Sequence, residues 1–132
     1  MTSFHLPLLL EGTVVHGQQL GRQLGFPTAN LDVAHLSEKL PTPGVYAASA
    51  LLDDGRHYRA MVNIGYCPTV AASRHTLSVE AHLDGFEGDL YGQHLSLTLL
   101  HRIRNERKMS SLDELQDQLA ADLREVRKLV HE

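Results

Sequence analysis

The chain has 132 residues, of which 42% are hydrophobic and 21% are charged, and this composition is typical of a single globular domain. Its formal net charge of −4 argues against sequence-independent binding to nucleic acid, which depends on many Lys and Arg contacts to phosphate. No apolar run reaches the ~18 residues of a membrane span, and the N-terminus lacks the features of a signal peptide, so we expect a cytoplasmic protein.

The first predicted strand covers residues 11–16 and leads into a glycine-rich loop. Three glycines within nine residues allow backbone N–H groups to turn inward, and they are Gly17, Gly21 and Gly25. Arg22 adds a planar donor that suits phosphate oxygens. The loop is not a Walker A loop, because Arg22-Gln23 stands where Lys-Ser or Lys-Thr is needed. It indicates either nucleotide binding outside the P-loop class or an ordinary loop that contains glycines.

A short polar segment, Pro27-Thr28-Ala29-Asn30, follows the loop. Pro27 pushes Phe26 toward an extended backbone, and Thr28 and Asn30, two residues apart, would then point the same way. A hydroxyl and an amide oxygen form a weak site for a hard cation, so nucleotide phosphates would have to complete the coordination. The segment therefore predicts Mg²⁺ bound jointly with a nucleotide, and the alternative is a turn with local side-chain hydrogen bonds.

Most of the remaining chain has the pattern of short strands joined by turns. After an irregular stretch at 31–44, strands are predicted at 45–52, 57–64, 76–83 and 95–99, with a hairpin turn at 53–55. In 57–64, the residues opposite the apolar face are His57, Arg59, Met61 and Asn63. In 76–83, the polar face consists of Thr76, Ser78, Glu80 and His82.

The C-terminal segment changes to a helical period. From Leu112 onward, apolar residues recur at helical spacing, and Ser111 with Glu114 offers a capping box in front of them. Many short antiparallel strands followed by one amphipathic helix predict a small closed or partly closed barrel, since closure removes exposed edges. The predicted fold class is therefore mainly β.

Glu80 is the acidic residue that stands out, because a carboxylate in mid-strand occupies a rigid position suited to a general base. A glutamate on the polar face of a strand is more often simply solvated, so position alone decides nothing. Downstream, a basic cluster before the helix consists of Arg102, Arg104, Arg107 and Lys108. This cluster is either a solvated basic turn or a clamp for an anionic product or phosphate.

Seven segments together resemble the riboflavin kinases, in the order and spacing of the kinase module of bacterial bifunctional flavokinase and FAD synthetase enzymes. They are G-T-V-V-H-G at 12–17, G-R-Q-L-G-F-P-T-A-N at 21–30, P-G-V-Y-A at 43–47, V-N-I-G-Y-C-P-T at 62–69, V-E-A-H-L at 79–83, D-L-Y-G at 89–92 and R-I-R-N-E-R-K-M at 102–109. The likeness covers about residues 11–130, and the Pro-Thr-Ala-Asn block is highly specific in this context.

The resemblance implies a six-stranded antiparallel Greek-key β-barrel with a C-terminal α-helix. It also implies a reaction in which the γ-phosphoryl group of ATP moves to the ribityl 5′-hydroxyl of riboflavin, giving FMN and ADP. The implied cofactor is Mg²⁺, with Zn²⁺ or Mn²⁺ as other candidates. The implied partners are riboflavin and ATP, with no nucleic acid and no membrane, and we expect a monomer.

The resemblance also supplies roles for single residues. By motif match, Thr28 and Asn30 resemble the residues that hold the metal with the nucleotide phosphates, and Glu80 resembles the general base. The residues matched to phosphate and flavin binding are Gly17, Gly21 and Arg22 for the phosphate flap, and Arg104 and Glu106 for the flavin.

The chain departs from the family pattern at Cys67, Ala71 and Met109, which concern the flavin loop and flavin affinity and leave the chemical residues intact. We expect residues 1–132 to form one kinase domain without an adenylyltransferase domain, and the initiating Met1 favours a free-standing protein. The alternatives are a non-catalytic flavin- or nucleotide-binding regulatory module of the same fold and, more weakly, a translation-type barrel that binds RNA.

Overall fold

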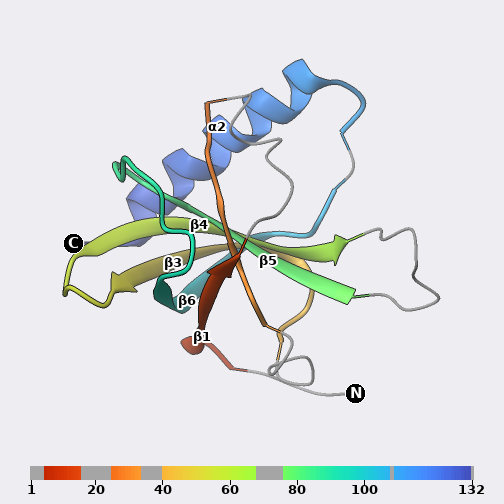
Figure 1. Ribbon diagram of the computed structural model, residues 1–132. Helices are drawn as coiled ribbons and strands as arrows, with labels where there is room; N and C mark the ends of the chain where they lie inside the picture. Colours follow the sequence, from red (N-terminus) through yellow and green to blue (C-terminus); the bar gives the residue numbers. More distant parts are fainter. Residues whose placement is uncertain (1–4, 16–24, 34–39, 68–75, 108, 132) are drawn as a thin grey trace.

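The computed structural model describes residues 5–15, 25–33, 40–67, 76–107 and 109–131 (Figure 1). Their elements, in chain order, are β1 (Leu8–Val15), β2 (Ala29–Leu31), β3 (Gly44–Leu52), β4 (His57–Cys67), β5 (Thr76–Leu83), β6 (His94–Arg104) and α2 (Leu112–Leu129). No helix among these residues combines the length and the apolar character that crossing a membrane requires.

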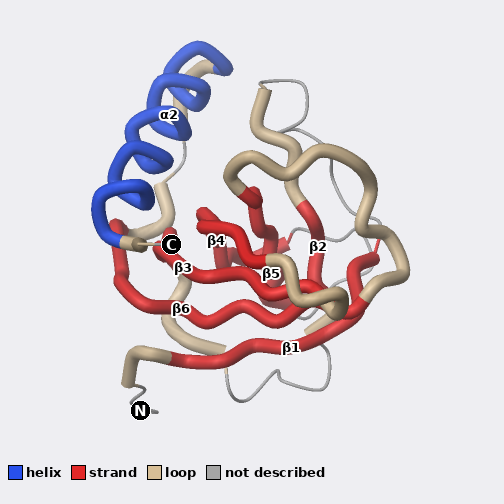
Figure 2. Tube along the Cα trace, turned by 90° about the vertical axis from the view of Figure 1, so that its left-hand side faces the viewer, coloured by secondary structure: helices blue, strands red, loops and turns tan. Residues whose placement is uncertain are grey.

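The six strands form a closed antiparallel barrel in the order β1-β2-β5-β4-β3-β6 (Figure 2). β3, β4 and β5 follow one another as neighbours, and β6 returns to lie beside β3, which is the Greek-key arrangement. Closure pairs both edges of the sheet and so removes the unpaired backbone that an open sheet of short strands would expose. The predicted six-stranded barrel with a C-terminal helix is confirmed.

The interior of the barrel is filled by the apolar face of each strand. On β5, Val79, Ala81 and Leu83 are at most 5% exposed, and the alternating residues Ser78 and Glu80 lie on the outer face. Core residues on other strands include Leu10, Val14, Tyr46, Val62, Leu95 and Leu97. Burying one aliphatic side chain contributes roughly 1.5–3 kcal/mol, so this interior stabilises the barrel and holds the outward side chains in fixed positions.

Helix α2 packs on the outside of the barrel, against β3, β4 and β6 (Figure 2). Its apolar side and the strands beneath form a second core that includes Leu123, Val126, Val130, Val45, Ala47 and Met61. The hydroxyl of Ser111 accepts a hydrogen bond from the Glu114 backbone N–H at 3.1 Å, which confirms the predicted start of the helix.

The elements differ from the predictions at several points. β1 begins at Leu8 instead of residue 11, and β4 continues to Cys67 instead of ending at residue 64. Residues 29–31 form β2, because β1 and β5 on either side supply hydrogen bonds that local propensity does not reveal. β6 continues to Arg104, so Arg102 and Arg104 lie in a strand and not in a basic turn. Met61, predicted on a polar face, is 5% exposed because α2 covers it.

Candidate active site

A row of side chains crosses the outer face of the barrel through five neighbouring strands. The backbone register places Asn30 of β2 opposite Glu80 of β5, and Glu80 opposite Asn63 of β4. The row continues through Val45 of β3 to Arg104 of β6. Directly opposed residues of antiparallel strands have Cβ atoms about 4.5–5.5 Å apart. The register therefore unites three predicted site residues, from three separate segments of the chain, on one rigid surface.

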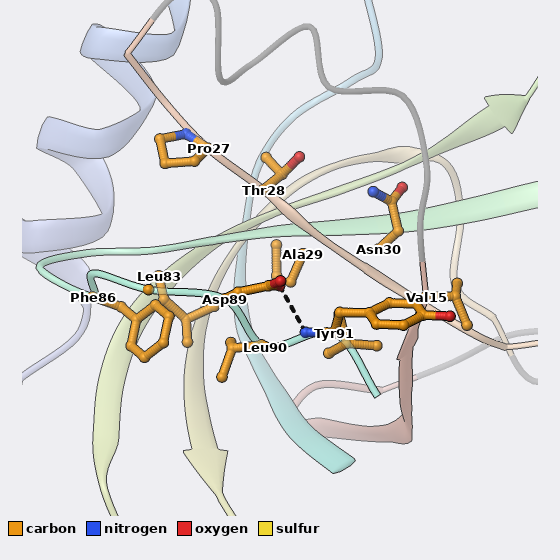
Figure 3. A pocket seen from close by; sticks show the side chains of 13 residues that line it. Val15, Pro27, Thr28, Ala29, Asn30, Leu83, Phe86, Asp89, Leu90 and Tyr91 are labelled. Carbon is orange, nitrogen blue, oxygen red and sulfur yellow. Dashed lines mark hydrogen bonds between the residues drawn. The ribbon is translucent and has the colours of Figure 1, made fainter. Parts of the chain in front are cut away.

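Thr28 and Asn30 lie at one end of this row. Their side chains point to the same side of the extended chain, and Ala29 points to the other side (Figure 3). Nδ1 of His82 lies 2.8 Å from the carbonyl oxygen of Pro27, and it carries the proton because a carbonyl only accepts. Ladder pairing and this hydrogen bond together fix the segment against β5.

A pocket of about 280 Å³ opens beside β2 and the connection between β5 and β6 (Figure 3). Much of its wall is apolar and is formed by Val14, Ala29, Ala81, Leu83, Phe86 and Leu90. Thr28 and Asn30 contribute to one side, and Asp89 and Tyr91 to another, where Asp89 Oδ1 accepts from the Tyr91 backbone N–H at 2.9 Å. A hollow of this kind suits a flat organic ring whose polar extension leaves toward Thr28 and Asn30.

Glu80 is partly buried at the centre of the β2, β5 and β4 surface. This burial raises the pKa of its carboxyl above the ordinary value of 4.5, because the charged form loses water. Within the described part of the chain, no side chain pairs with this carboxylate or donates a hydrogen bond to it. A carboxylate with a raised pKa and a free lone pair has the properties required of a general base.

Arg104 ends the row and is tied to helix α2. Its Nε lies 3.0 and 3.1 Å from the two carboxylate oxygens of Asp122, and its Nη2 lies 2.8 Å from Oδ2. Asp122 also accepts from Gln118 Nε2 at 2.9 Å. The side chains of Arg104 and Asp122 are 20% and 2% exposed, so the interpretation of Arg104 as part of a solvated turn is wrong.

The carboxylate of Glu106 lies over β4, near the Arg104 end of the row. A Cβ at Gly65 would overlap this carboxylate, so the missing side chain makes room for it. Two arginines hold Asn105, the residue before Glu106. Arg102 Nη2 donates to Asn105 Oδ1 at 2.6 Å, and Arg104 Nη1 donates to the Asn105 carbonyl at 3.1 Å. The position of Glu106 is thus built by β6 and not by a free loop.

The predicted site residues fall into two groups. Those that the structure brings to one side of the barrel are Thr28, Asn30, Glu80, Arg104 and Glu106. Those outside the described residues are Gly17, Gly21 and Arg22, and Ala71 also lies outside. Among the described residues there is no group of three or more His, Cys, Asp or Glu side chains that could hold a metal.

Sequence reasoning missed several residues of this region. Asn63 was visible as one member of an alternating face and within the V-N-I-G-Y-C-P-T segment of the family resemblance, with no role assigned, and its place beside Glu80 depends on strand register. Phe86 gave no signal, and Tyr91 appeared only within the D-L-Y-G segment of the family resemblance, with no role assigned, although both line the pocket. Asp122 carried a usable signal, because a charged residue stands on the apolar side of a helix, next to Leu123.

Comparison with known proteins places the chain among sequence relatives. The matching family model is described as riboflavin kinase (flavokinase) and spans residues 4–130. The bifunctional riboflavin kinase/FMN adenylyltransferase of Escherichia coli K12 is 44% identical over 116 residues, which cover 88% of this chain and 36% of that protein. The RNA-binding riboflavin kinase RibR of Bacillus subtilis is 39% identical over 115 residues, which cover 87% of this chain and 48% of that protein.

A solved structure shows the same architecture. The riboflavin kinase of Trypanosoma brucei superposes with a TM-score of 0.62 at 26% identity, over 91% of this chain and 74% of that chain. By contrast, the chain spans little more than a third of the length of the Escherichia coli relative.

Proposed function

The chain belongs to the riboflavin kinase family, and from this premise we propose that it transfers the γ-phosphoryl group of ATP to the ribityl 5′-hydroxyl of riboflavin, giving FMN and ADP. The observation that carries the proposal is the register of β2 and β5. It sets Glu80, a carboxylate of raised pKa, directly beside Asn30 of the Pro-Thr-Ala-Asn segment. A proton acceptor thus lies next to the segment proposed to hold the phosphates.

The pocket supports a place for the nucleotide. Its apolar walls suit the flat base, and its volume of about 280 Å³ is too small for a whole nucleoside triphosphate. The phosphates therefore extend out of the pocket, over Thr28 and Asn30, whose side chains point to one side of β2 (Figure 3). In this arrangement the γ-phosphoryl group reaches the surface near Glu80. The phosphate-flap residues proposed with it are Gly17, Gly21 and Arg22.

The donor set at β2 fits a hard cation that a nucleotide helps to bind. Thr28 offers a hydroxyl and Asn30 an amide oxygen, and these neutral ligands leave most of the coordination to phosphate oxygens and water, as Mg²⁺ commonly requires. When bound, the ion offsets the negative charge of the phosphates. The contribution of the chain is to hold two oxygens in one direction on a paired strand. Mn²⁺ and Zn²⁺ remain candidates for the same ligands.

The transfer step needs one proton acceptor. The 5′-hydroxyl oxygen forms a bond to the γ-phosphorus while the bond from that phosphorus to the β,γ-bridging oxygen breaks, and ADP leaves with the bridging oxygen. The hydroxyl proton passes to the carboxylate of Glu80. Because β5 is paired with a strand on each side, the backbone from which the Glu80 side chain projects is held in place before the substrates bind.

Riboflavin and ATP are the partners of this function. Arg104 and Glu106 mark the end of the row proposed for the flavin, away from β2. A role in RNA binding, which the name of the Bacillus subtilis relative states for that protein, receives little support from this chain. Its net charge is −4, and several arginines are paired with carboxylates, including Arg56, Arg104, Arg107 and Arg127.

The proposal is tested by incubating the purified chain with riboflavin, ATP and Mg²⁺ and separating the flavins by chromatography. We expect FMN to accumulate, to disappear when EDTA removes the metal, and to return when Mg²⁺ is restored in excess. The same assay with Mn²⁺ or Zn²⁺ ranks the metals. If riboflavin binds but no FMN forms with any of the three ions, the chain is a flavin-binding module that lacks turnover.

A further inference from the structure

Asn63 is the neighbour of Glu80 on the side away from the Pro-Thr-Ala-Asn segment. In the row across the outer face, Glu80 of β5 stands between Asn30 of β2 and Asn63 of β4. Asn63 itself is flanked along β4 by Val62 and Ile64, both 0% exposed. These neighbours anchor the strand in the core, so the Asn63 side chain projects from a rigid position.

The side chain of Asn63 is exposed, and no described residue forms a hydrogen bond with it. Its amide offers a carbonyl acceptor and two N–H donors. A hydroxyl group also both donates and accepts. An amide side chain therefore suits a ligand hydroxyl better than it suits a ligand carboxylate, which only accepts, or a ligand ammonium, which only donates. The neighbouring surface of β4 and β5 is polar as well. Gly65 lies two residues further along β4, and Ser78 Oγ donates to its carbonyl at 3.2 Å.

The direction of phosphoryl transfer decides which substrate lies over Asn63. The attacking and leaving oxygens lie roughly in line, on opposite sides of the transferred phosphorus. The leaving nucleotide occupies the β2 side, where the pocket, Thr28 and Asn30 are found. The acceptor must therefore approach Glu80 from the opposite side, and on the surface of the barrel that side begins with Asn63.

We propose that Asn63 binds the polyol chain of the acceptor, at the hydroxyl next to the one that receives the phosphoryl group, and thereby selects acceptors with two adjacent hydroxyls. This inference rests on the proposed function, because it takes the reaction and the side of nucleotide binding from there. A polar group that hydrogen-bonds a substrate hydroxyl discriminates strongly against an analogue without that hydroxyl, since the polar group is then left unpaired. Asn63 is thus a residue that determines specificity, distinct from the base and from the metal ligands.

The experiment compares Asn63→Ala with the wild type and with the control His57→Ala. His57 is also exposed on β4 but lies six residues earlier, outside the row. We expect Asn63→Ala to lower kcat/KM for riboflavin by roughly 10- to 100-fold while the KM for ATP changes less than about twofold. His57→Ala should match the wild type. Equal losses toward both substrates, or no loss toward riboflavin, would overturn the proposal.

A modified acceptor separates recognition of a hydroxyl from a general disturbance of the surface. With 4′-deoxyriboflavin, the wild type should lose about the same factor that Asn63→Ala loses with riboflavin. The variant and the analogue combined should lose little more than either alone, because both remove the same hydrogen bond. If the loss of the variant and the loss of the analogue multiplied when the two were combined, the proposed contact between Asn63 and the 4′-hydroxyl would be contradicted.

A binding measurement keeps this inference distinguishable from the proposed function. Quenching of flavin fluorescence gives the Kd of riboflavin without turnover, and thermal unfolding confirms that the variant folds. If the wild type binds riboflavin but makes no FMN, the proposed function fails, and weaker binding by Asn63→Ala than by His57→Ala still supports the contact. Unchanged riboflavin affinity in a folded Asn63→Ala protein rejects the contact whatever the activity.

Discussion

At the scale of single residues, Glu80 combines two properties that oppose each other. Its partial burial places a carboxylate where the charged form is poorly hydrated, which raises the pKa and disfavours the ionised state. The same environment keeps the carboxylate free of described partners and next to Asn30. Function and stability therefore make different demands on this residue, and a substitution can separate them.

We expect Glu80→Gln to lower kcat by roughly 10²- to 10⁴-fold, the usual contribution of a positioned base. Wild-type kcat should decline as the pH falls through the raised pKa, so the acid limb of its profile lies above the ordinary glutamate value of 4.5. Steady-state kinetics across the pH range measure both effects. Glu125→Gln, an exposed change on α2, is the control and should leave kcat unchanged.

The same variant has an expected stability signature in the absence of metal and nucleotide. Because the folded pKa of Glu80 lies above its unfolded value, the folded state binds this proton more tightly. The resulting stability is fully present below the unfolded pKa and is lost as the pH rises through the folded pKa. Glutamine resembles the protonated form. Glu80→Gln should thus match the wild-type Tm in acid and exceed it at pH 7 to 8, and a lower Tm at pH 8 would contradict this account.

The sequence predicted which face of its own strand a residue lies on, but not which residues of other strands lie beside it. Alternation along 76–83 placed Glu80 on the outer face, and two-residue spacing placed Thr28 and Asn30 on one side of an extended segment. Neither pattern could show that Asn30 and Asn63 flank Glu80, because register across strands depends on how the barrel closes. The contact between Glu106 and Gly65 was equally hidden, since it joins segments that are distant in the chain.

At the scale of elements, β6 and α2 are joined by a nearly enclosed ion pair. The carboxylate of Asp122 receives hydrogen bonds from Arg104 and Gln118, and its side chain is 2% exposed. The pair fixes the end of β6, from which Asn105 and Glu106 extend toward β4. The helix therefore does more than cover the barrel: it sets the position of one end of the candidate site.

Removing Asp122 should be costly, because it leaves the guanidinium of Arg104 largely enclosed without its counter-ion. Breaking a buried pair typically costs about 3–5 kcal/mol, and the 20% exposure of Arg104 places the expected loss for Asp122→Ala near the lower end. Urea denaturation measures this loss. Asp117→Ala, an exposed change on the same helix, should stay within about 0.5 kcal/mol of the wild type. A loss of similar size in both variants would show that the ion pair is not the cause.

Strongly patterned elements were easier to predict than weakly patterned ones. β5 and the start of α2 were located correctly, because each carries an unbroken period and the helix has a recognisable cap. β2 was missed because three residues are too few to show an alternation of apolar and polar side chains. Their extended conformation depends on pairing with β1 and β5. β6 was predicted too short because its C-terminal residues include two arginines, which suggested a solvated turn. In the structure, these arginines donate hydrogen bonds to Asn105 and Asp122.

At the scale of the whole molecule, barrel closure explains how so short a chain presents the surface proposed to bind two substrates. The apolar interior holds the barrel together, and the outer face of β2, β5 and β4 is left to present polar side chains. The pocket proposed for the nucleotide opens on one side of Asn30, and the Arg104 and Glu106 region lies at the other end of the row. Closed topology was predictable from many short strands, whereas this division of the surface was not.

The proposed function assigns one reaction, phosphoryl transfer, to these residues. The family match occupies residues 4–130 of the 132-residue chain, and the bifunctional Escherichia coli relative has nearly two thirds of its length outside the aligned region. Synthesis of FAD from FMN requires transfer of an adenylyl group, with attack at the α-phosphorus instead of the γ-phosphorus. We therefore expect the purified 132-residue chain, given riboflavin and excess ATP, to accumulate FMN without FAD. Chromatography after prolonged incubation, with added FMN and ATP as a second starting mixture, checks this expectation. FAD formation from either mixture would mean that the pocket also presents the α-phosphorus to a flavin phosphate.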